Sequence, residues 1–153
     1  MSDWLWEVDT AGRYTYCSPR CRQLLGFEPE ELLGRTPFDL MAPDEAQRIR
    51  ATFEGCVRRG TGFAGVVNRN LRKDGREVIL ESSGEPFFDA QGRLAGFRGV
   101  DRDISERQRQ QEALAREREL LRTVIDTSPN FVAVKDRAGR FVLVNRAVAE
   151  TYG

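Results

Sequence analysis

The stretch over residues 63–107 constrains the fold of this chain more than any other part. Residues 63–72 and 76–88 are rich in Val, Ile, Leu and Phe, and a Lys-Asp-Gly sequence at 73–75 separates them. An Asp-Gly pair between two apolar runs is typical of a β-hairpin turn. A further strand is predicted over 93–102, so the sequence indicates three strands joined by tight turns.

A helix is predicted to follow the third of these strands without an intervening loop. Ser105, with Gln108 three residues later, has the spacing of a capping box, in which two side chains satisfy free backbone N–H groups at a helix start. We expect a linker helix over 105–126. The junction at Asp103, Ile104 and Ser105 is therefore the place where we expect a signal to leave the sheet.

The first 60 residues predict two more strands, followed by helices. Trp4, Trp6 and Val8 alternate with other residues, which indicates a strand with one buried face. A second strand is predicted over 14–17 and a helix over 44–59, with shorter helical turns between them. This order of elements, with short connections, is typical of an α+β fold in which helices cover one face of an antiparallel sheet.

Composition argues against several classes of function. The 24 basic residues balance the 24 acidic ones, so no nucleic-acid footprint is present. No apolar run reaches the roughly 18 residues of a membrane span, and no membrane contact is expected for this segment. The three cysteines, without any histidine, are interpreted as reduced structural thiols of a cytoplasmic protein. Because no phosphate-binding loop or catalytic constellation is recognisable, the segment is not expected to be an enzyme.

Several short signatures occur in order along residues 2–107. They are the turn Asp9-Thr10-Ala11-Gly12, then Leu25-Gly26-Phe27, Leu33-Gly34-Arg35, Arg72-Lys73-Asp74-Gly75 and Asp103-Ile104-Ser105. With these signatures, residues 1–104 resemble a PAS sensory domain with its C-terminal PAC motif, whose usual ending is Asp-Ile-Thr. The resemblance implies a PAS fold, a five-stranded antiparallel sheet in the order 2-1-5-4-3. It also implies a parent protein of the sensor histidine kinase or diguanylate cyclase type.

The resemblance allows cofactors to be considered position by position. Light-sensing flavin members carry a reactive Cys where this chain has Pro37, so a photoadduct is not expected. Asn70 matches one of their flavin contacts, whereas Leu80 and Asp101 replace the other two. Asn70 either binds a ligand, such as a non-covalent flavin or a small metabolite, or faces solvent. Haem-binding members use an axial His, which is absent from this sequence.

Two other pairs of residues leave alternatives open. Trp6 and Phe38 either line a ligand pocket or simply fill the core, where aromatic residues are common. Gly96 and Gly99, inside the last predicted strand, either open space for a ligand or accommodate the twist of the sheet.

The linker helix carries an incomplete apolar stripe. Leu114, Leu121 and Ile125 follow one another at spacings of seven and four, and Val124 lies beside them. An isolated helix of this length is only marginally stable. The stripe therefore predicts a homodimer through this helix or packing of the helix on the sheet, and a solvated spacer is the alternative.

An internal repeat follows the linker helix. Residues 136–141 repeat residues 9–14 at an offset of 127, and in the same register Asn145 falls on Ser18. Residues 127–153 are therefore predicted to be the opening hairpin and first helix of a second PAS domain, cut off mid-fold. Such a segment would be mobile, or ordered by packing on the first domain, the linker helix or a second chain.

Two functional hypotheses follow from the sequence. In the first, the domain senses a ligand or redox state and relays it through the linker helix to a kinase or cyclase output domain of the parent chain. In the second, the domain has a filled core, binds no ligand, and serves for protein–protein interaction, dimerisation and relay between neighbouring domains. Any catalytic activity is expected in other domains of the parent protein.

Overall fold

The computed structural model describes residues 3–152 of the 153-residue chain. The described residues form two compact units, which divide between Glu106 and Arg107. Within this part of the chain, no helix is both long and apolar enough to cross a membrane.

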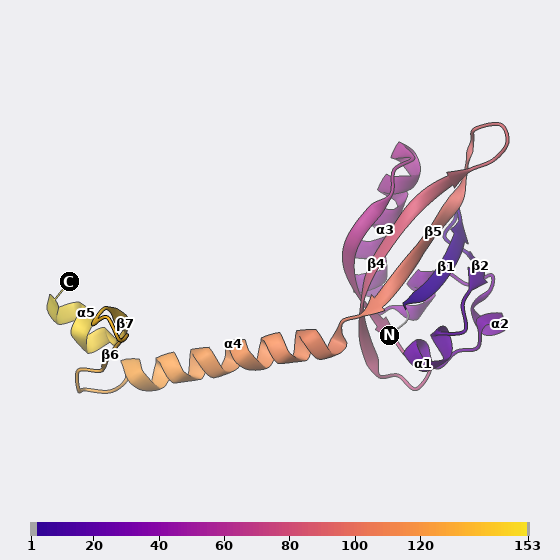
Figure 1. Ribbon diagram of the computed structural model, residues 1–153. Coiled ribbons are helices and arrows are strands. Elements are labelled where there is room, and N and C mark those ends of the chain that lie inside the picture. Colours follow the sequence, from indigo (N-terminus) through magenta and orange to yellow (C-terminus); the bar gives the residue numbers. More distant parts are fainter. Residues whose placement is uncertain (1–2, 153) are drawn as a thin grey trace. The chain divides into compact units, whose positions relative to one another are not determined.

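The first unit contains a five-stranded antiparallel sheet. Its strands are β1 (Trp4–Asp9), β2 (Tyr14–Cys17), β3 (Phe63–Leu71), β4 (Glu77–Phe88) and β5 (Leu94–Asp103). They lie in the order β2-β1-β5-β4-β3, so the last strand of the unit pairs with the first, as Figure 1 shows. The α+β class and the strand order implied by the PAS resemblance are both confirmed.

Helical segments connect β2 to β3. They are α1 (Cys21–Leu25), α2 (Pro29–Leu32), the 3-10 helix η1 (Pro37–Leu40) and α3 (Pro43–Arg59). Helix α3 begins with Pro43 in its first turn, where the missing N–H costs nothing, and ends at Gly60, whose φ is +62°. It packs against β3 and forms part of the cover over the sheet (Figure 1).

The core lies between these helices and the inner face of the sheet. Trp4, Trp6 and Val8 are buried there, which confirms the predicted face of β1. A Cβ atom at Gly99 would lie 2.6 Å from Trp6 Cζ2, and one at Gly84 would lie 2.9 Å from Trp6 Cη2. The space that Gly99 leaves is therefore filled by the Trp6 indole and is not open to a ligand.

The second unit begins within α4 (Ser105–Asp126), the helix that follows β5. It contains the remainder of α4, the hairpin strands β6 (Ala133–Lys135) and β7 (Phe141–Val144), and α5 (Arg146–Tyr152). The two short strands pair antiparallel in a sheet of their own. The helix has the bounds that the sequence predicts.

Asn145 organises the second unit. Its side chain is fully buried and donates to the backbone oxygens of Ile125 and Asn130, at 2.9 and 2.8 Å. Its Oδ1 accepts from the N–H groups of Val132 and Val148. The sequence left open what residues 127–153 pack against. In the structure, the β6–β7 hairpin packs on the end of the linker helix.

Candidate ligand cavity and signal exit

A small cavity lies between the inner face of the sheet and the segment formed by η1 and α3. Its volume is about 60 Å³. Apolar and aromatic side chains form most of the wall, and a polar group of side chains forms one part of it. The lining residues are Trp6, Val8, Gly12, Tyr14, Pro37, Phe38, Met41, Ile49, Thr52, Phe53, Phe63, Val66, Asn68, Asn70, Ser82 and Asp101.

The polar side chains of the wall form a hydrogen-bonded chain across four strands. Asn70 Nδ2 on β3 donates to Asn68 Oδ1 at 2.6 Å, and Asn68 Nδ2 donates to Ser82 Oγ on β4 at 2.9 Å. The Ser82 hydroxyl donates to the carboxylate of Asp101 on β5. Trp6 Nε1 on β1 donates to Asp101 Oδ1 at 2.9 Å. Every member is held by a neighbour, so the chain fixes the polar part of the cavity.

The structure brings the three pocket candidates of the sequence together. Trp6, Phe38 and Asn70 all line the cavity and all are buried. Asn70 is only 3% exposed, so the alternative in which it faces solvent is wrong. Its role in ligand binding stays a prediction.

Sequence reasoning missed two members of the hydrogen-bonded chain, Asn68 and Ser82. A signal for Asn68 was present, because it lies two residues before Asn70 and so shares its face of β3. Ser82 lacked such a signal, since its place beside Asp101 depends on the register of β4 against β5.

Asp101 is the carboxylate of the cavity wall and is 6% exposed. Burial raises the pKa of this carboxyl to about 6, and the hydrogen bonds from Ser82 and Trp6 act in the opposite direction. Burial also raises the pKa of the Cys17 thiol, to about 12, and that of the Tyr14 hydroxyl. Cys17 and Tyr14 are therefore neutral at physiological pH, which agrees with a structural role for the thiol.

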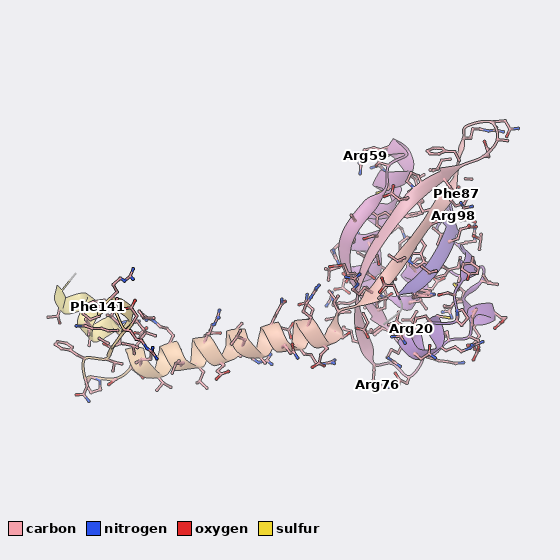
Figure 2. The ribbon with its side chains drawn as sticks, viewed as in Figure 1. Arg20, Arg59, Arg76, Phe87, Arg98 and Phe141 are labelled. Carbon is pink, nitrogen blue, oxygen red and sulfur yellow. The ribbon has the colours of Figure 1, made fainter. Side chains whose placement is uncertain are left out.

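Charged residues gather on the opposite face of the sheet. Arg98 pairs with Glu7 at 2.8 Å, and its guanidinium carbon lies 4.1 Å from the centroid of the Phe87 ring (Figure 2). Because side chains alternate along a strand, Glu7 faces away from the cavity that its neighbour Trp6 lines. None of the residues that line the cavity is basic.

Glu45 fixes α3 to the sheet and was not predicted from the sequence as a buried residue. The carboxylate is 2% exposed, accepts from Arg48 Nε at 2.8 Å and accepts from the backbone N–H of Arg69 on β3 at 2.7 Å. The hydrogen bond from Arg48 is the main reason that the pKa of Glu45 is lowered to about 2, and the bonds from Arg69 add to it. This carboxylate thus ties one side of the cavity cover to β3.

Neither flavin nor haem fits this cavity. Ligand pockets for drug-sized molecules are about 300–1,000 Å³, several times the volume of about 60 Å³ found here. Pro37, Leu80 and Asp101 also stand where flavin-binding members place their Cys, second Asn and Gln, and the chain has no His to ligate haem. Among the described residues, no group of three or more metal-ligating side chains is found.

The exit from the sheet lies two residues beyond Asp101. Ile104 is buried, and its N–H donates to the backbone oxygen of Ile79 on β4 at 3.0 Å. The N–H of Ile79 in turn donates to Ser105 Oγ at 2.8 Å. Asp103 Oδ1 accepts from the N–H of Ser105 at 2.9 Å. These bonds hold the start of α4 against the beginning of β4.

The capping-box prediction at Ser105 is wrong. The helix begins at Ser105 itself, so this residue is the first helical residue and not the N-cap. Its hydroxyl bonds Ile79, which is 26 residues away in sequence, and the carboxylate of Asp103 satisfies its N–H. A tertiary contact has replaced the local one that the Ser-to-Gln spacing suggested.

The apolar residues predicted for a dimer lie on α4 in the second unit. Leu114, Leu121 and Val124 are exposed, and Ile125 is half-buried. The backbone oxygen of Ile125 accepts from Asn145, so the end of this stripe belongs to the packing of the second unit.

Comparison with known proteins identifies the family. A family model described as "PAS fold" matches residues 14–101, more than half of the chain, and a model described as "PAS domain" matches residues 119–153. The chain therefore belongs to the PAS family, whose members are typically sensory modules without catalytic activity. The second match agrees with the repeat found in the sequence.

Two of the curated relatives are described as sensor proteins. The aerobic respiration control sensor protein ArcB of Escherichia coli is 29% identical over 103 residues, which are 67% of this chain and 13% of that protein. The two-component sensor PprA of Pseudomonas aeruginosa is 32% identical over 101 residues, which are 66% of this chain and 11% of that protein. The chain thus spans about an eighth of the length of these relatives.

Solved structures share the fold. A sensory box histidine kinase/response regulator from Burkholderia thailandensis superposes with a TM-score of 0.64 at 24% identity, covering 79% of this chain and 91% of that one. The N-terminal domain of a diguanylate cyclase with PAS/PAC sensor from Marinobacter aquaeolei superposes with a TM-score of 0.63 at 18% identity, covering 70% and 99%.

Proposed function

We propose that the first unit senses a small molecule in the cavity under α3 and relays its occupancy along β5 into helix α4. The observation that carries this proposal is the position of Asp101. It is part of the cavity wall, and two residues later on the same strand Asp103 begins the contacts that hold Ser105. A change in the position of Asp101 would therefore move the start of α4 through a short, rigid stretch of paired backbone.

The rest of the signalling pathway is proposed by analogy with the relatives. Residues 105–126 would act as the signalling helix between the domain of residues 1–104 and the second PAS segment of residues 127–153. The output would lie in a histidine kinase or diguanylate cyclase domain of a longer cytoplasmic protein. The exposed Leu114, Leu121 and Val124, with Ile125, would form a homodimer seam along this helix.

The test separates coupling from folding. Asn70→Ala alters the cavity wall and should change the amide exchange of residues 105–109, because the hydrogen-bonded chain from Asn70 reaches Asp101. In an Asp103→Ala background the same cavity change should leave these amides unaffected, while circular dichroism shows an intact fold.

Asp89→Ala is the matched control for the exit variant. Asp89 makes the same kind of carboxylate-to-backbone bonds, to Gln91 and Arg93, but at the opposite end of β5 from the exit. It should leave the coupling intact. If Asp103→Ala changes neither the helix start nor the output of the parent protein, the relay through this residue is disproved.

A second candidate function is an interaction module with a filled core. The small volume of the cavity favours it, because Trp6 occupies the space above Gly99 and Gly84. In that case Asn70→Ala would alter the stability of the first unit without any effect at the start of α4.

A further inference from the structure

The cavity wall contains one acidic side chain and no basic one. All 24 Lys and Arg residues lie within the described residues 3–152, and none of them lines the cavity. One carboxylate, Asp101, does, together with five aromatic rings. The rings belong to Trp6, Tyr14, Phe38, Phe53 and Phe63.

Among the described residues, the donors to the Asp101 carboxylate are neutral groups, and no cation donates to it. Trp6 Nε1 and the Ser82 hydroxyl donate to it, and both are neutral groups. Arg50 stacks over the Phe38 ring at 4.6 Å, but its side chain is exposed and is not part of the lining. A buried carboxylate without a cation is unfavourable in water-excluded surroundings, and a positively charged ligand would relieve that cost.

Other titratable groups surround Asp101. Tyr14 of β2 lines the cavity with Asp101, Cys17 of the same strand as Tyr14 lies near Asp101, and both are neutral. On its other side, Asp101 borders a second cavity whose charged members are Asp3, Arg20, Arg102 and Asp103. Arg102 there pairs with Asp3 at 3.5 Å. No arginine is among the groups that shift the pKa of Asp101.

We propose that the cavity binds a small organic ammonium ion, with its charged nitrogen at the Asp101 carboxylate and its alkyl groups against the aromatic walls. The inference rests on the proposed sensing role and names the class of ligand for the same site. Carboxylates bind ammonium groups through charge-assisted hydrogen bonds, and aromatic rings attract cations through their negative faces. Asn68 and Asn70 hold Ser82, and thereby Asp101, in place.

The volume limits the size of the ion. One water needs about 10–15 Å³ of such space, so about 60 Å³ admits a ligand of at most roughly four to six non-hydrogen atoms. Methylammonium and dimethylammonium are within this limit, whereas the longer polyamines are not. Methanol and ethylene glycol are neutral molecules of comparable size.

The experiment is a titration of the whole 153-residue chain, labelled with ¹⁵N, by methylammonium and dimethylammonium chloride. Sodium chloride at equal concentration controls for ionic strength, and methanol and ethylene glycol are the neutral probes. The indole N–H of Trp6 reports the site because it bonds Asp101, and the backbone N–H of Gly139 in the second unit is the internal reference. We expect the ammonium ions to shift the Trp6 signal saturably and the neutral probes to bind at least tenfold more weakly.

Two further arms test the role of the carboxylate. Asp101→Asn keeps the shape of the side chain and should weaken ammonium binding at least tenfold, while Glu77→Gln, an exposed carboxylate of β4, should not. On the unmodified chain, binding should weaken about tenfold between pH 7.5 and pH 5, because Asp101 with a pKa of about 6 becomes protonated. The pH dependence tests the role of the carboxylate even if the Asp101→Asn variant does not fold.

The outcomes distinguish the inference from the sensing proposal. If the neutral probes bind as tightly as the ammonium ions, the cation assignment is overturned but a ligand site remains. If neither class shifts the Trp6 signal beyond the sodium control, the cation assignment is overturned, and the coupling test with Asn70 and Asp103 then decides the sensing role.

Discussion

The β1–β2 hairpin of the first unit and the β6–β7 hairpin of the second have the same local hydrogen bonds but very different surroundings. Asp9 Oδ1 accepts from the N–H groups of Ala11 and Arg13, and Asp136 Oδ1 accepts from the corresponding groups 127 residues later. Gly12 and Gly139 have φ angles of +86° and +81°. The turn is therefore formed by its own residues, whatever covers the strands.

The two hairpins also close in the same way, through a side chain after the second strand. Ser18 Oγ accepts from the N–H of Leu5 at 2.9 Å, and Asn145 Oδ1 accepts from the N–H of Val132 at 3.1 Å. The Asn145 amide additionally donates to Ile125 and thereby holds the linker helix. In the second unit, whose described strands form a sheet of only two, one buried amide carries more of the structure.

The largest expected difference concerns the matched aromatic pair Tyr14 and Phe141. Tyr14 is 4% exposed and Phe141 is 63% exposed. Tyr14→Ala should destabilise the first unit by about 3–5 kcal/mol, and Phe141→Ala, which loses a cation–π contact with Lys135, should change the stability of the second by no more than about 1 kcal/mol. Urea unfolding followed by tryptophan fluorescence measures the first unit alone, because Trp4 and Trp6 are the only tryptophans; amide exchange measures the second.

A large effect of Phe141→Ala would break the comparison. It would mean that the apolar surface of the β6–β7 hairpin is covered in solution, by a second copy of the chain or by another part of this one. Repeating the measurement at several protein concentrations would separate these two cases.

The next effect is a pH dependence confined to the first unit. The pKa of Asp101 is raised from 3.8 to about 6 in the folded state, so the folded state holds this proton more tightly. Stability should therefore fall as the pH rises from about 4 to about 6, by roughly 3 kcal/mol in total, and stay level above that range.

Asp101→Asn removes this titration. The difference between the unmodified chain and the variant in urea unfolding, followed by tryptophan fluorescence, should show the fall between pH 4 and pH 6. Glu45, whose pKa is lowered to about 2, acts in the opposite sense below pH 4.5 in both proteins and cancels. Equal pH profiles for the two proteins would show that Asp101 is not buried as a carboxylate.

A smaller effect is expected at the residues that close the hairpins. Asn145→Ala removes three partly buried hydrogen bonds, to the backbone groups of Ile125, Asn130 and Val132, and should cost about 2–3 kcal/mol. Ser18→Ala loses one bond to Leu5 and should cost about 1 kcal/mol. Amide exchange of residues 132–145 measures the first variant and urea unfolding the second; costs of equal size would contradict the distinction between the two hairpins.

The smallest effect distinguishes the two turn glycines. Gly139→Ala should cost about 1 kcal/mol, because a residue with a Cβ is strained at its positive φ but meets no other atom within 4 Å. Gly12→Ala should cost roughly 1 kcal/mol more, since its Cβ would lie 3.1 Å from Phe38 Cε2. Urea unfolding measures the effect of Gly12→Ala, and amide exchange measures that of Gly139→Ala. A larger cost at Gly139 would contradict the comparison.

Local sequence determined the turns, the ends of most elements and the family. The Asp-to-Gly turns at 9–12 and 136–139, the end of α3 at Gly60 and the buried face of Trp4, Trp6 and Val8 were predictable because each depends on residues a few positions apart. The strand order depends on distant residues and was predicted only from the resemblance to the PAS family.

Only the tertiary structure decided the cavity and the exit. Asp101 lies beside Ser82 and Trp6, and Ser105 lies beside Ile79, because of strand register over many residues of separation. The same register brings Trp6 over Gly99 and thereby sets how much space a ligand has. Short-range patterns fix conformation, whereas burial and the pairing of distant polar groups depend on which strands become neighbours.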